Sequence, residues 1–188
     1  MNDPISKLTG HVGALIRSID LCLGKGLVLP ALILIYSGID VLAALERCQA
    51  EGTRQSFVRW ADRYLAPRMQ CSGIDLYGAR CGILHSLSAS SDLSRGQKAR
   101  VVCYAWGTSK AADLEVIADT LEWEDPVVVH ISDLRDSLVE AITEYFEDVS
   151  TNDERVAMVI GNAGKDWLSH VPGEVVDKLM GGDNCGGA

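Results

Sequence analysis

Apolar residues recur at helical spacing along the first part of this chain. From residue 4 to 24 they lie three or four positions apart, which predicts an amphipathic helix. Glycines then interrupt the pattern, and Pro30 suits the first turn of a second helix over residues 27–45. This segment is long and apolar enough to cross a membrane, but its carboxylate at position 40 would be costly there. The pattern therefore favours a central core helix and no membrane.

Two more helices are expected before residue 96. One begins at Thr53 and stops before Pro67, with aromatic residues on its inner face and arginines on the rest. The other covers residues 73–87, and Ser72 is placed to cap its first turn. Its buried stripe is expected to comprise Ile74, Tyr77, Cys81, Ile83, Leu84 and Leu87.

The second half of the chain mixes strand and helix patterns. Residues 100–106 and 126–131 are rich in β-branched and aromatic side chains and predict short strands or a small β-hairpin. A helix is expected between them, over residues 109–121. Residues 132–149 and 152–169 predict further helices, the first capped by Ser132 or Asp133 and acidic on its outer face.

These elements predict a mainly α fold, a helical bundle with short strands and further helices in its C-terminal half. We expect a helical core over residues 1–96 and an acidic α/β extension over residues 97–180 that packs on it, unless the two form one domain. The glycine-rich residues 181–188 are expected to be disordered.

Charge is divided unevenly along the chain. Residues 1–110 carry a net charge of +5 and residues 111–188 a net charge of −14, which gives −9 overall. An acidic protein is a poor general binder of nucleic acid, but the basic half can still attract a polyanion. The acidic half is then a candidate surface for a protein partner, although solubility alone also explains it. The basic side chains that could contact nucleic acid are Arg54, Arg59, Arg63, Arg68, Arg95, Lys98 and Arg100.

Several kinds of chemistry find no support in the sequence. It contains no phosphate-binding loop, no dinucleotide-binding fingerprint and no cysteine and histidine spacing typical of zinc. We therefore expect neither a metal nor an organic cofactor. The start of the chain, MNDPISK, lacks the pattern of a signal peptide, and six cysteines without paired spacing fit reduced thiols, so we expect a cytoplasmic location.

The pair Arg80 and His85 is the strongest chemical candidate. Five positions on a helix place two residues about 140° apart around the axis and about 7.5 Å apart along it. The two side chains can meet if the arginine reaches along the helix, if Gly82 distorts the backbone, or if a second copy of the chain brings them together. Gly78 and Gly82 form a thin strip, continued by Ser86, on which another helix could pack, and a tightly packed core helix would show the same strip.

The stretch ARCGILHSLS, with four residues between arginine and histidine, resembles the R-x4-6-H motif of the HEPN superfamily. These are all-helical domains found widely in bacterial toxins and defence proteins. The run ALILIYSGIDVLAAL is similar to an early helix of such domains, with a lone acid inside it. The resemblance covers roughly residues 10–95. It implies a metal-independent ribonuclease that acts as a dimer, although nuclease members usually carry a polar residue where this chain has Cys81.

The residue types agree with that chemistry. RNA supplies its own nucleophile, so cleavage needs one base, one acid and a cation over the phosphate. Histidine titrates near neutral pH, and the arginine fork matches phosphate oxygens. We predict a metal-independent endoribonuclease, a homodimer through the Gly78–Gly82 face, with catalytic Arg80 and His85. Asp40, Tyr36 and Ser86 are the expected supporting residues, with Asp40 paired to Arg80. The alternative is a non-catalytic helical module for dimerisation, nucleotide binding or partner recruitment.

Overall fold

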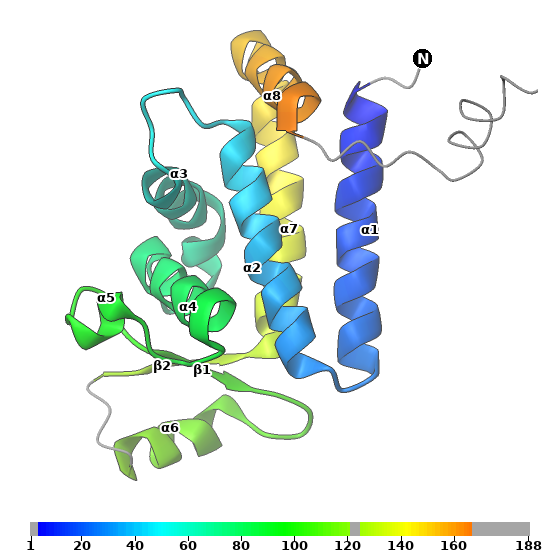
Figure 1. Cartoon of the computed structure of the whole chain (residues 1–188). Coiled ribbons are helices and arrows are strands. Elements are labelled where there is room, and N and C mark those ends of the chain that lie inside the picture. Colours follow the sequence, from blue (N-terminus) through cyan, green and yellow to red (C-terminus); the bar gives the residue numbers. More distant parts are fainter. Residues whose placement is uncertain (1–3, 121–124, 167–188) are drawn as a thin grey trace, which may run out of the picture.

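The computed structural model describes residues 4–120 and 125–166 (Figure 1). It is a mainly α protein with one small parallel sheet, which confirms the fold class that the sequence predicts. The helices of the first half are α1 (Pro4–Gly24), α2 (Val28–Leu45), α3 (Thr53–Trp60), α4 (Gly73–Ser86) and the short α5 (Asp92–Arg95). Those of the second half are α6 (Ala111–Thr120), α7 (Ile131–Ser150) and α8 (Asp153–Asp166), and the strands are β1 (Val102–Ala105) and β2 (Val127–His130).

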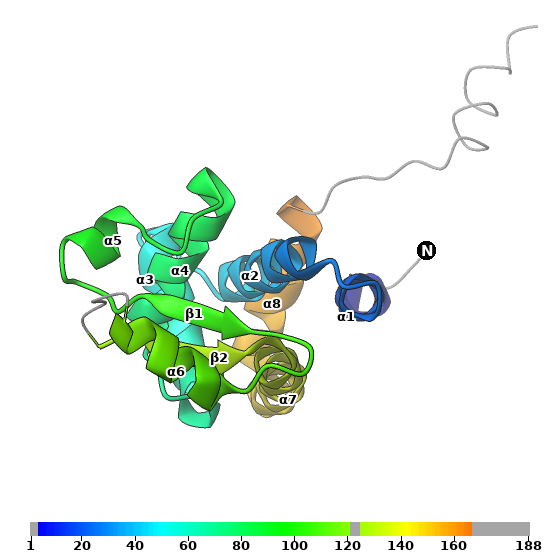
Figure 2. The same cartoon turned by 90° about the horizontal axis from the view of Figure 1, so that it is seen from below.

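Helix α2 is the centre of the bundle. It lies between α1 on one side and α4 on the other in both views of the fold (Figures 1 and 2). Its buried side includes Leu32, Ile35, Tyr36 and Ile39, which join one continuous hydrophobic core. Within the described residues, α2 is the one helix with the length and hydropathy of a membrane span, and half of that span is buried against the rest of the protein. In this fold α2 packs as a core helix.

The helix that starts at Thr53 does not stop at Pro67 but changes its geometry. α3 passes into a π-helical turn, η1 (Ala61–Leu65), and then into a 3-10 turn, η2 (Ala66–Arg68). The wider π turn keeps Tyr64 on the buried side together with Trp60. The aromatic inner face predicted for this helix is therefore buried over its whole length.

The two strands pair in parallel, with Val102 opposite Val127 and Ala105 opposite His130. The sequence predicted either short strands or a β-hairpin. The hairpin prediction is wrong, because a hairpin needs antiparallel strands. Here α6 crosses from the end of β1 back to the start of β2, as a parallel pair requires. In Figures 1 and 2, α6 lies over one face of the two-stranded sheet.

Helix α7 follows its predicted pattern closely, with one difference at its start. The expected core positions Leu134, Leu138, Ile142, Tyr145 and Val149 are all buried. The cap, however, is neither Ser132 nor Asp133. The backbone N–H of Ser132 donates to Nδ1 of His130, 3.2 Å away, so the helix begins directly after β2. The predicted helix 152–169 is observed as α8 over Asp153–Asp166, whereas residues 167–169 and the tail 181–188 lie outside the described residues.

Of the buried stripe expected on α4, Ile83 alone is buried. Leu76, Ala79 and Ile83 are buried, whereas Ile74, Tyr77, Cys81 and Leu84 are only half buried, and Leu87 lies beyond the helix with 65% of its surface exposed. The small residues Gly78 and Gly82 also face neighbouring segments, which approach too closely there for larger side chains.

Candidate functional site

Arg80 lies between an acid and a histidine. Its Nε donates to Oδ2 of Asp40 on α2 at 2.8 Å, and its Nη1 donates to Nε2 of His85 at 3.0 Å. The predicted pair of Asp40 with Arg80 is therefore confirmed. The side chains of Arg80 and Asp40 are 17% and 20% exposed, and His85 is exposed, so the cluster opens to solvent at its histidine end.

The structure brings Arg80 and His85 together within one chain. α4 is a regular helix between them, and the arginine side chain reaches along it toward the C-terminus. The sequence left three possibilities open: arginine reach, distortion at Gly82, or contact with a second copy. The structure shows the first. At the other end of α4, Ser72 and Asp75 form a capping box that fixes where the helix starts, as predicted for Ser72.

The surroundings keep Arg80 charged and oriented. Partial burial works against its charge, but the hydrogen bond to Asp40 and the charge of that carboxylate outweigh it, so the pKa of Arg80 lies above its ordinary value. The guanidinium carbon also lies 5.8 Å from the centre of the Tyr77 ring, within the range of a cation–π contact. Oδ1 of Asp40 is buried and has no hydrogen-bond partner among the described residues.

The hydrogen bond between Arg80 and His85 fixes the form of the imidazole. A guanidinium has only donors, so Nε2 of His85 must be the acceptor. The neutral ring then carries its proton on Nδ1. In this arrangement Nε2 of His85 is occupied by the donor from Arg80.

The two other expected supporting residues have different surroundings. Tyr36 is fully buried, and its hydroxyl shares a short hydrogen bond with the hydroxyl of Tyr104 on β1. Burial raises the pKa of both phenols well above the usual value, so they stay protonated. Ser86 is exposed, but its hydroxyl donates to the backbone oxygen of Gly82 at 3.0 Å. Tyr36 thus supports the packing of α2, and Ser86 the end of α4.

The strip of small residues on α4 is not open to a second copy. A Cβ on Gly82 would lie 2.5 Å from the backbone oxygen of Ser88, and one on Gly78 would lie 3.0 Å from the Cβ of Ala99. The chain's own segment after α4 therefore covers this face. The prediction of a homodimer contact through the Gly78–Gly82 face is therefore corrected, because this face already packs against the same chain.

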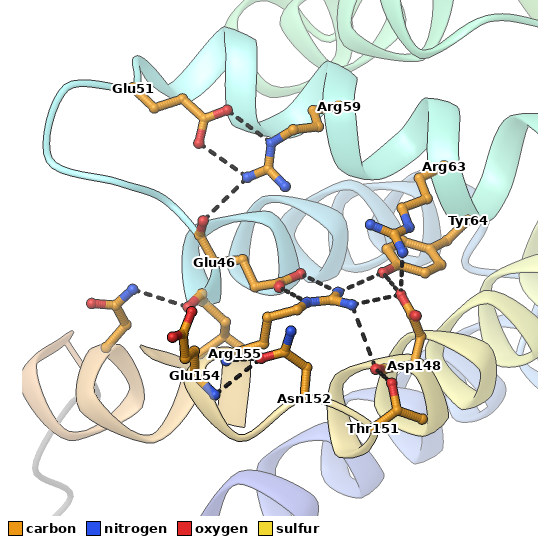
Figure 3. A network of polar contacts seen from close by, with 12 residues as sticks. Glu46, Glu51, Arg59, Arg63, Tyr64, Asp148, Thr151, Asn152, Glu154 and Arg155 are labelled. Atoms are coloured by element: carbon orange, nitrogen blue, oxygen red, sulfur yellow. Dashed lines mark hydrogen bonds and ion pairs between the residues drawn. The ribbon is translucent and has the colours of Figure 1, made fainter. Parts of the chain in front are cut away.

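Most of the candidate nucleic-acid-binding arginines are held by carboxylates. Arg59 pairs with Glu51, as Figure 3 shows, and Arg100 pairs with the buried Asp75. Five of the seven candidates form such pairs, which reduces the positive potential that they present to a polyanion. The other three paired arginines are Arg63 with Asp148, Arg68 with Glu140 and Glu144, and Arg95 with Asp92. Arg54 and Lys98 are exposed and form no ion pair with another described residue.

A second polar cluster was missed by the sequence analysis. Arg155 of α8 donates to both carboxylate oxygens of Glu46 at 2.6 and 3.0 Å, to Asp148 at 2.8 Å and to the Tyr64 hydroxyl at 2.8 Å (Figure 3). Glu46 directly follows α2, the other residues belong to η1, α7 and α8, and no short motif connects them. The cluster joins α8 and α7 to α2 and η1, so we assign it to stability.

No group of three or more His, Cys, Asp or Glu side chains in the described parts of the chain is arranged to hold a metal ion. Asp136, in the first turns of α7 after β2, accepts a hydrogen bond from Nη1 of Arg135 at 2.8 Å.

Comparison with known proteins gives no relative on which to base the function. No protein-family model matches the chain, and neither a curated protein nor a solved structure is similar to it. The functional interpretation therefore depends on the geometry of the Asp40, Arg80 and His85 cluster.

Proposed function

We propose that the protein is a metal-independent endoribonuclease, with Arg80 and His85 as its catalytic residues. The observation that carries the proposal is the direct hydrogen bond between them, with the charge of Arg80 secured by Asp40 behind it. This places a permanent cation and a titratable group side by side at the solvent-open end of a helix.

The geometry supports a defined order of events. A phosphate of RNA that binds the guanidinium competes with His85 for Nη1 of Arg80, since phosphate is the stronger acceptor. Nε2 of His85 is then free to take the proton of the neighbouring 2′-hydroxyl, whose oxygen attacks the phosphorus. The 5′-oxygen leaves with a proton from an acid, and the products are a 2′,3′-cyclic phosphate and a 5′-hydroxyl.

Within one chain, His85 supplies one of the two proton transfers, the one from the 2′-hydroxyl. A second copy of the protein would supply the other, so we propose that the active form is a homodimer. The dimer contact must lie outside the Gly78–Gly82 face, which the chain itself covers. The acidic outer side of the second half remains a candidate surface for a protein partner.

The test is cleavage of RNA in excess EDTA. Wild type, His85→Ala and Arg80→Lys are compared, and the product ends are examined for cyclic phosphate. Loss of a general acid or base is expected to lower the rate by about 10²- to 10⁴-fold. Arg80→Lys keeps the charge but not the two-point fork, so it should also be impaired. Arg135→Lys, which alters another Arg–Asp pair, is the matched control and should cleave as wild type does.

A second candidate function is a helical module that binds a nucleotide or a protein partner without catalysis. The specific observation in its favour is the pairing of five of the seven candidate basic side chains, which leaves little free positive charge for RNA. Absence of cleavage of mixed cellular RNA by a folded protein would refute the ribonuclease and favour this module.

A further inference from the structure

The large apolar side chains that the fold leaves exposed gather at one end of the molecule. In the described part of the chain nine such residues are exposed, and six of them belong to three segments. These segments are the turn between α1 and α2, the start of the loop after β1, and α6, which all lie at the lower end of the molecule in Figure 1. Single exposed apolar residues are normal, but a group of them marks an interaction surface. The six side chains of this apolar end are 39–66% exposed and comprise Leu21, Leu27, Leu29, Trp106, Val116 and Ile117.

The turn between α1 and α2 presents leucines on both sides of a lysine. Leu21 lies in the last turn of α1, Leu29 in the first turn of α2 and Leu27 between the helices. The exposed Lys25 lies among them, and Gly26 has a left-handed backbone, φ 69°, where the chain reverses. In Figure 1 this turn is the projecting end of a helical hairpin. A convex tip can enter a fluid lipid phase, which adapts its shape, whereas a protein surface must offer a matching hollow.

The charge around this turn also fits a lipid surface. Between Asp20 and Asp40 the sequence contains no acidic residue, and Lys25 is its only charged side chain, although the whole chain carries a net charge of −9. Asp20 itself is paired with Arg135 at 2.7 Å. A lysine beside exposed leucines suits a membrane surface, because the leucines can enter the acyl region while the ammonium group stays at the headgroups. Trp106 is of the residue type that is enriched at membrane–water interfaces.

We propose that this end of the protein binds the surface of a lipid bilayer, with Leu21, Leu27 and Leu29 entering the acyl region. Trp106 lies at the level of the headgroups, and Lys25 contacts their phosphates. Helix α6 also carries exposed acids, so the insertion is assigned to the turn between α1 and α2 and to Trp106.

This surface contact differs from a membrane span. Helix α2 stays packed in the core, and Asp40 lies about 18 Å along it from its first residue, Val28, so the carboxylate remains outside the lipid. The contact does not depend on RNA cleavage, because the residues that make it are not those of the Asp40, Arg80 and His85 cluster.

The contact is tested by flotation with vesicles of phosphatidylcholine and phosphatidylglycerol. Wild type is expected to float with the vesicles, at high salt as well, because salt screens charge pairs but not the burial of apolar side chains. The double variant Leu27→Ser with Leu29→Ser should bind about a hundredfold more weakly, since each leucine that loses its burial accounts for about tenfold. Both side chains are exposed, so the variant should fold as wild type does. The matched control is Leu87→Ser with Met158→Ser, which removes two exposed apolar side chains outside the apolar end and should float as wild type does.

Tryptophan quenching identifies the face that meets the lipid. Lipids brominated on their acyl chains should quench the fluorescence of the bound protein, and Trp106→Phe should remove most of that quenching, because Trp60 is buried in the core. Quenching that is the same in wild type and Trp106→Phe would show that another face binds.

The remaining outcomes also decide the question. Wild type that stays in the soluble fraction, or a Leu27→Ser, Leu29→Ser variant that floats as well as wild type, would overturn the proposal. Binding that is lost at high salt would replace insertion of the leucines by attraction between charges. A protein that ignores vesicles but forms dimers, which the same double variant dissociates, would assign the apolar end to a second copy instead.

Discussion

Replacing Arg155 by methionine should destabilise the fold strongly, although the residue lies near the end of the described chain. The substitution keeps the apolar part of the side chain and removes the hydrogen bonds to Glu46, Asp148 and the Tyr64 hydroxyl (Figure 3). Glu46 is 8% exposed, so its carboxylate would be left nearly buried without its cation. The hydrogen bond to Glu46, which outweighs the opposing effect of burial, also raises the pKa of Arg155 well above its usual value.

The magnitude follows from this burial. Removal of one partner from a buried ion pair costs about 3–5 kcal/mol, whereas an exposed pair contributes about 0–1 kcal/mol. For a chain of this length, 1 kcal/mol corresponds to a change in Tm of about 2–4 °C. Arg155→Met should therefore lower Tm by about 6–20 °C. The matched control is Arg135→Met, which breaks the more exposed pair with Asp20 and should lower Tm by no more than about 4 °C.

Tm is measured by thermal unfolding followed by far-UV circular dichroism, and the free energy of unfolding by urea unfolding followed by tryptophan fluorescence. The double variant Glu46→Leu with Arg155→Met should recover part of the lost free energy of unfolding, because it also removes the uncompensated carboxylate. If Arg155→Met and Arg135→Met lower the free energy of unfolding by the same small amount, the assignment of the Arg155 cluster to stability is wrong.

Two further predictions concern other buried groups. Burial alone would raise the pKa of Asp75, but hydrogen bonds from Ser72 and Arg100 lower it below its usual value. A carboxylate of this kind stabilises the fold above about pH 4 and loses its contribution as the pH falls through its folded-state pKa. Asp75→Asn should thus cost more free energy of unfolding at pH 6 than at pH 2.5, and an equal cost at both would contradict this account. Burial raises the pKa of the Cys71 thiol to about 12 and that of Cys103 to about 11, while Cys48 is exposed. Alkylation of the native protein at pH 8 should therefore modify Cys48 long before the other two, as peptide mapping would show.

The helices could be predicted because their pattern is local. In α7, every third or fourth residue is apolar, and those residues are the ones that the structure buries. Ser72 could likewise be identified as a cap, because its partner Asp75 is three residues away. The pairing of Asp40 with Arg80 followed from an energetic argument, because an acid inside an apolar helix needs a cation, although Arg80 lies on another helix.

The predictions that were wrong depend on contacts and backbone turns outside the element that carries the pattern. The glycines of α4 have the spacing of a helix–helix contact, and only the tertiary structure shows that residues 88–99 fill that space. Leu87 continues the apolar spacing of α4, but the backbone turns left-handed there and the side chain is exposed. The strand pattern was recognised, whereas the parallel direction depends on the crossover through α6.

The sequence by itself determined the helical fold class, the positions of most elements and the pair Arg80 and His85 as the chemical candidate. These depend on periodicity, capping and side-chain chemistry, which are properties of neighbouring residues. The tertiary structure decided which charges remain free, because the acidic second half folds back onto arginines of the first half. It also decided which apolar surfaces remain open, since burial depends on what packs against a helix and not on the residues of the helix alone.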